Sequence, residues 1–216
     1  KATKDPGGLL TDALFKINEN KRPNLEYYKN NCISFFVPAA IAALSILVKD
    51  AFQFSASDLH ADYNFLQYLF KYEFAYDVDK TPEYFVRKNL KAFIDEAILM
   101  PHPKLPDTYN LTSFGFRKLQ LFSRFLKPYF ESYWIVLNYF MKYPQNSIKA
   151  KERLKKIEAI GNHMYKKKEI ERKEALSIIN YNNGIEFFTY NGVKGSDDNE
   201  KILFYADGIH KYLNCL

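Results

Sequence analysis

A run of seventeen residues without a charged side chain, Cys32 to Val48, most constrains how this chain can fold. Its length lies at the lower edge of what a membrane-spanning helix needs. The run also holds Ser34, Pro38 and Ser45, and alanine is its most frequent residue. We therefore predict a buried core helix rather than a membrane span. Pro38 should lie near the start of its main helical part, since an interior proline breaks the hydrogen-bond ladder.

The composition indicates a predominantly α-helical globular chain with minor β elements. A hydrophobic fraction of 47% over 216 residues excludes a disordered protein. Only eight glycines argue against a β-barrel with many tight turns and against a glycine-rich phosphate loop. Two cysteines, Cys32 and Cys215, fit a reducing compartment rather than a disulfide framework. The sequence begins at Lys1 without methionine or an apolar signal segment, so we expect a fragment of a longer protein.

Several start and stop signals divide the first two thirds of the chain. Ser57-Asp58 and Thr81-Pro82-Glu83 are typical of helix N-termini. Two short extended pieces within 98–111, joined through three prolines, predict a small two-stranded wing, so parts of the fold resemble a winged helix. A long apolar-rich stretch follows from Phe114 to Tyr143, and Pro128 predicts a break near Lys127.

The last third is more strongly charged. We predict a charged helix over about 147–168, then a shorter helix that ends at Gly184. The aromatic residues of 186–190 predict a short strand, and a last helix should run to Tyr212. These changes in composition along the chain predict three parts, which are a lead-in or linker over 1–24, an aromatic-rich helical subdomain over 25–146 and a basic helical subdomain over 147–216.

An aromatic stripe follows the predicted helices of the long apolar-rich stretch. Such a stripe can line a lipid groove, but it more often forms a core, and we favour the core. Its members are Phe114, Phe116, Phe122, Phe125, Tyr129, Phe130, Tyr133 and Trp134.

Positive charge is concentrated between residues 149 and 174. Ten basic residues there face five acids, a difference of +5 against +6 for the whole chain. The segment is either a surface for an anionic membrane or an acidic partner, or a solvated helix face with opposite charges three or four residues apart. Nucleic acid is not an expected partner, because no nucleic-acid motif accompanies the charge. The basic residues are Lys149, Lys151, Arg153, Lys155, Lys156, Lys166, Lys167, Lys168, Arg172 and Lys173.

One histidine–aspartate pair has a spacing that suggests chemistry. His102 and Asp107 have four residues between them, as in acyltransferases that use a histidine base oriented by a carboxylate. Two prolines stiffen the intervening chain, and no glycine–arginine element follows to hold a substrate phosphate. We therefore expect a loop histidine at chance spacing. No cofactor and no metal site are expected, because histidines and cysteines lack neighbours at ligand spacing.

Three blocks in order carry a family resemblance. Tyr27-Tyr28-Lys29-Asn30-Asn31 precedes an apolar segment with Phe36-Val37-Pro38-Ala39, and further blocks follow at 70–98 and 119–137. In this order the chain, from about Leu25 to about Val193, resembles the C-terminal region of bacterial membrane-associated glycerol-3-phosphate acyltransferases of the PlsB type.

The resemblance implies a non-catalytic helical domain whose parent enzyme acylates glycerol 3-phosphate in phospholipid biosynthesis. The catalytic module would lie upstream in the same polypeptide, so no catalytic residue is carried onto this chain. The parent would use acyl-CoA or acyl-carrier protein and act peripherally on the cytoplasmic side of the bacterial inner membrane, while the isolated chain would be soluble. The alternatives are a winged-helix-like module that binds nucleic acid or an acidic protein, and, more weakly, an acyltransferase acting through His102 and Asp107.

Overall fold

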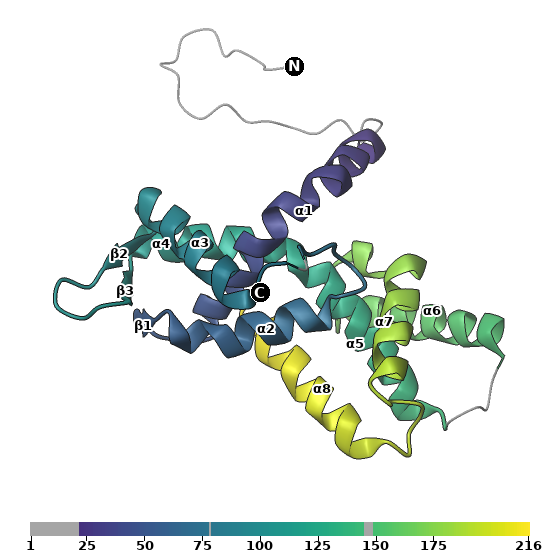
Figure 1. The fold of residues 1–216 in the computed structure, drawn as a ribbon. Coiled ribbons are helices and arrows are strands. Elements are labelled where there is room, and N and C mark those ends of the chain that lie inside the picture. Colours follow the sequence, from purple (N-terminus) through teal and green to yellow (C-terminus); the bar gives the residue numbers. More distant parts are fainter. Residues whose placement is uncertain (1–21, 78, 145–148) are drawn as a thin grey trace, which may run out of the picture. The chain divides into compact units, whose positions relative to one another are not determined.

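A computed structural model describes residues 22–77, 79–144 and 149–216, with the backbone alone for 22–32 and 34. The chain has two compact units, Lys1–Phe35 and Phe36–Leu216. The packing described in the following paragraphs is that of the second unit. That unit is predominantly helical with one small sheet, as predicted (Figure 1). Nearly all of the predicted lead-in lies outside the described residues, and the subdomain boundaries at 24 and 146 stay predictions.

The charge-free run lies in helix α1 (Arg22–Leu47). Val37 and every residue from Ala40 to Leu47 are buried, so the predicted core helix is confirmed. The position predicted for Pro38 is wrong, because the helix begins at Arg22 and contains the proline in its interior. A proline removes one backbone hydrogen bond, and the continuous burial of the turns after it offsets that loss. No helix of the described part of the chain is long and apolar enough to span a bilayer.

The predicted Thr81 cap is confirmed, whereas the Ser57-Asp58 cap is wrong, because both residues lie within a 3-10 turn and neither side chain caps the helix that follows. A 3-10 turn, η2 (Ser57–Leu59), leads into α2 (His60–Leu69). Helix α3 (Pro82–Asp95) begins after Thr81, whose hydroxyl accepts a hydrogen bond from the Tyr84 amide at 3.4 Å.

The predicted wing is part of a three-stranded antiparallel sheet. Strands β2 (Leu99–Pro101) and β3 (Thr108–Leu111) pair as expected. A strand that the sequence analysis missed, β1 (Gln53–Ser55), pairs with the other edge of β3, so the order is β1-β3-β2. At three residues, β1 is too short to produce a clear alternating pattern.

Helix α5 (Lys127–Lys142) is the centre of the packing in the second unit. It follows α4 (Ser113–Ser123) and the 3-10 turn η3 (Arg124–Leu126), which confirms the break predicted near Lys127. Figure 1 shows α5 beside the helices that it contacts, and these are α6 (Ala150–Lys166), α7 (Ile178–Tyr190) and α8 (Asn199–Leu213).

Two predictions for the last third are wrong. Residues 186–190 form the end of α7 rather than a strand, and Gly184 lies inside that helix rather than ending it. A Cβ atom at position 184 would lie 3.3 Å from Cγ2 of Val136, so this glycine permits α7 to approach α5 closely. Phe187 and Phe188 are fully buried, and this helical packing overrides the strand preference of aromatic side chains.

The aromatic stripe divides between core and surface. Phe130 and Tyr133 are fully buried in α5, as predicted. Phe114 is 54% exposed and Phe116 is 39% exposed, so the core prediction is wrong for the α4 end of the stripe.

Candidate partner or membrane surface

The basic segment forms an exposed surface on α6, the turn after it and the 3-10 turn η4 (Lys173–Ala175). Of its ten cations, all but Arg153 and Lys156 are exposed. Acids are interleaved with them, and Glu152 pairs with Lys156 at 3.8 Å. We call the exposed cations of residues 149–173 the basic surface.

A buried acid in α5 fixes the chain path of this surface. The carboxylate of Glu131 accepts hydrogen bonds from the backbone amides of Glu171 at 2.8 Å and Arg172 at 2.9 Å. Burial raises the pKa of Glu131, and the two amides counteract that rise. On the same helix Lys127 pairs with the Glu171 carboxylate at 2.7 Å. The turn after α6 is therefore held by its backbone, which leaves the Arg172 side chain exposed.

Ser132 extends this support. Its hydroxyl lies 2.8 Å from the carbonyl oxygen of Ala175 and accepts a weaker hydrogen bond, at 3.3 Å, from Asn180 of α7. The sequence analysis missed both Glu131 and Ser132. The available signal was Glu131 itself, the only acid of α5 in an otherwise apolar run.

His102 and Asp107 lie in the hairpin between β2 and β3, each engaged with other groups. Nδ1 of His102 accepts hydrogen bonds from the backbone amides of Lys104 at 3.2 Å and Leu105 at 3.0 Å. The Asp107 carboxylate accepts hydrogen bonds from both terminal nitrogens of Arg87 on α3, at 3.3 and 3.2 Å. These contacts close the wing onto α3.

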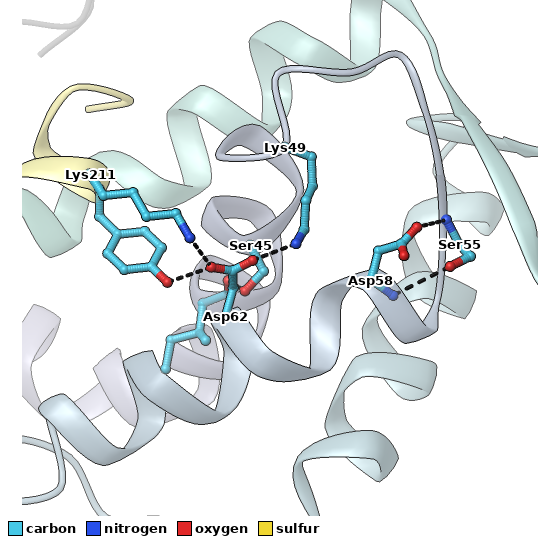
Figure 2. A network of polar contacts seen from close by, with 8 residues as sticks. Ser45, Lys49, Ser55, Asp58, Asp62 and Lys211 are labelled. Atoms are coloured by element: carbon cyan, nitrogen blue, oxygen red, sulfur yellow. Dashed lines mark hydrogen bonds and ion pairs between the residues drawn. The ribbon is translucent and has the colours of Figure 1, made fainter. Parts of the chain in front are cut away.

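A second acid is enclosed by donors. Asp62 of α2 is only 5% exposed, yet Nζ of Lys49 and Nζ of Lys211 each lie 2.6 Å from its carboxylate (Figure 2). The Tyr212 hydroxyl donates to the same carboxylate at 2.6 Å. Burial alone would raise the pKa of Asp62, but the hydrogen bonds from these three donors outweigh it and lower the pKa. This cluster joins the end of α1, the start of α2 and the end of α8.

A third acid has fewer hydrogen-bond donors around its carboxylate than Asp62 has. Glu73, just after α2, accepts one hydrogen bond from Nδ2 of Asn183 at 2.9 Å. Its other oxygen and the nearby hydroxyls of Tyr76 and Tyr133 are buried without a well-formed hydrogen bond in the described structure, although Tyr133 is close enough to help lower the pKa of Glu73. Burial raises the pKa of Glu73 to about 7.

Within the described ranges, no group of three or more His, Cys, Asp or Glu side chains is placed to hold a metal ion.

The fold and this surface define a helical domain with a small sheet and an exposed basic segment. A model of the family described as "Glycerol-3-phosphate acyltransferase C-terminal region" matches residues 3–197. The chain belongs to this family of glycerol-3-phosphate acyltransferase C-terminal regions. No curated protein matches it. The family description places the chain in a polypeptide with an upstream part, as the sequence resemblance implied.

Proposed function

We propose that this chain is a non-catalytic helical domain of an enzyme that acylates the 1-hydroxyl of glycerol 3-phosphate. The single observation that carries the proposal is the family match over residues 3–197. The engagement of His102 by backbone amides and of Asp107 by Arg87 supports a structural role for that hairpin. The reaction, from acyl-CoA or acyl-carrier protein, belongs to the upstream module, and this domain packs against that module.

The basic surface supports a further part of the proposal, which is contact with an anionic membrane. Arg172 and Lys173 lie on or beside a turn whose backbone is held by Glu131, so this part of the surface has a defined path before a partner arrives. Each cation near an anionic bilayer adds about 1 kcal/mol of attraction. In this proposal the contact is peripheral and lies on the cytoplasmic side of the bacterial inner membrane.

The deciding experiment measures acyl transfer from a long-chain acyl-CoA to glycerol 3-phosphate by this chain alone, with His102→Ala beside it. We expect no turnover from either protein, and turnover when the upstream module is present in the same polypeptide. Turnover by the chain alone that disappears in His102→Ala would overturn the proposal and make the hairpin an active site.

A further inference from the structure

The outward side of α4 combines apolar and cationic side chains. Phe114, Arg117, Leu121 and Arg124 recur at intervals of three or four residues, so they lie on one side of the helical path through α4 into η3. All four are exposed, Phe114 at 54% and Leu121 at 64%. We call these four residues the α4 face.

The opposite side of α4 is fixed to the rest of the fold. Gly115, Leu119 and Ser123 are buried. A Cβ atom at position 115 would lie 2.1 Å from the Ile98 carbonyl oxygen, so the start of α4 lies directly against the backbone at Ile98. The Thr112 hydroxyl caps the helix through the Gly115 amide at 2.8 Å. Helix α4 is therefore held in place by its buried side and its cap. Phe114 and Leu121 remain outside the core.

The segment that carries the α4 face has charged side chains of one sign only. Residues 112–128 contain Arg117, Lys118, Arg124 and Lys127 and no acid. Nζ of Lys118 lies 5.3 Å from the centroid of the Phe114 ring, which keeps a further cation beside the exposed aromatic side chain. An amphipathic helix with phenylalanine, leucine and basic residues together is typical of binding in the interface of an anionic bilayer.

Two other regions with exposed apolar or cationic side chains lack this combination. On α8, Leu203 and Phe204 are 51% and 61% exposed, but Glu200 and Asp207 lie one helical turn away from them. The basic surface on α6 has cations interleaved with acids, and its most exposed large apolar side chain is Tyr165, at 38%. Neither region joins exposed apolar side chains to charge of one sign.

The α4 face adjoins the basic surface. Lys127, directly after η3, pairs with Glu171 in the turn after α6. Arg124 is close enough to the same carboxylate to help lower its pKa, although Lys127 contributes most. The two cationic regions therefore meet at Glu171.

We propose that the α4 face is the apolar anchor of this domain on an anionic lipid bilayer, with Phe114 and Leu121 entering between headgroups while Arg117 and Arg124 contact lipid phosphates. The proposal rests on the membrane contact proposed above for the basic surface, and it assigns insertion to α4 and long-range attraction to α6. A bilayer fits this face better than a protein partner does, because the alternation of exposed apolar and cationic groups matches the acyl–phosphate boundary.

The test is co-sedimentation of the full chain with vesicles of phosphatidylglycerol and phosphatidylcholine, compared with pure phosphatidylcholine. We expect binding to the anionic vesicles only. Arg117→Gln with Arg124→Gln should weaken it about thirtyfold. Phe114→Ser with Leu121→Ser should weaken it tenfold or more, since two partly inserted side chains are lost.

Matched controls separate anchoring from general effects. Leu203→Ser with Phe204→Ser removes the same two residue types at similar exposure from α8, and it should leave vesicle binding unchanged. Circular dichroism and thermal unfolding check that each variant is folded.

Equal losses in the α4 and α8 variants, or equal binding to both lipid mixtures, would overturn the proposal. So would α4 variants that bind vesicles normally but lose the upstream module, because the occupant would then be a protein. Acyl transfer by the chain alone would overturn the proposed function and leave the vesicle result to be judged separately.

Discussion

Asp62 and Glu73 lie eleven positions apart, at the two ends of α2, and the core treats them oppositely. Asp62 is contacted by two lysines and a tyrosine hydroxyl, and its pKa is lowered. Glu73 receives one amide donor and faces tyrosines, and its pKa is raised to about 7. Burial opposes ionisation at both sites. Two cations and a hydroxyl therefore outweigh the effect of burial on the pKa of Asp62, whereas the single amide donor at Glu73 does not outweigh it.

The largest effect is expected from removing the Asp62 carboxylate. Asp62→Ala leaves the buried Tyr212 hydroxyl without its acceptor and removes the shared partner of the partly exposed Lys49 and Lys211, so we expect the free energy of unfolding to fall by about 3 kcal/mol. Urea denaturation at pH 7 measures this change. Asp58→Ala is the control, since it removes an acid of the same charge nearby whose main partner is the Ser55 amide, and it should lose about 1 kcal/mol. Equal losses would contradict the assignment.

Glu73→Gln tests the other side. A carboxyl with an ordinary pKa of 4.5 and a folded pKa of about 7 prefers the neutral form in the folded chain. The folded state then holds the extra proton between those values, so stability is fully present below pH 4.5 and falls as pH rises towards 7. That gap corresponds to about 3 kcal/mol.

The glutamine variant should therefore gain up to about 3 kcal/mol at pH 8 and be unchanged at pH 4. Its amide oxygen can still accept the Asn183 hydrogen bond. Urea denaturation between pH 4 and pH 8 measures both values. A variant that is destabilised equally at both pH values would show that folding leaves the pKa of Glu73 unshifted.

Asp62 should produce the opposite trend in acid. Because its pKa is lowered on folding, its contribution is present above its ordinary value of 3.8 and is lost as pH falls through the folded pKa. In the Asp62→Asn variant the loss of stability relative to wild type should therefore shrink as pH falls below 4. The same denaturation series checks this, and a pH-independent difference would contradict it.

The smallest effect distinguishes the two lysines. The Lys49 side chain is 27% exposed and that of Lys211 is 51% exposed. Lys49→Met should therefore cost about 1 kcal/mol, and Lys211→Met less, since the more exposed ion pair is better screened by water. Thermal unfolding at low and high salt measures the difference, and the reverse order would contradict it.

Local signals in the sequence predicted a large part of the fold. The Thr81 cap, the wing and the break near Lys127 each depend on neighbouring residues, and each is confirmed. The strand predicted over 186–190 is wrong because Phe187 and Phe188 are buried against α5 and α8, which are distant in sequence from them.

The polar sites depend on such distant partners even more. Asp62 and Tyr212 are 150 positions apart, and Glu73 and Asn183 are 110 apart. No local pattern predicts such pairs. The sequence already showed the concentration of basic residues at 149–173. The contact of Glu131 with the turn after α6 could be seen only in the folded structure. Whether that surface meets a membrane stays a proposal.

The contact of Glu131 with the turn after α6 fixes the backbone of that turn without fixing the charge of its side chains. Because the carboxylate binds backbone amides, which every residue except proline supplies, the turn keeps its path whichever side chain stands at position 172. Substitutions there can alter the surface potential without rebuilding the loop. The charge of this turn can therefore change at position 172 while its contact with α5 is kept.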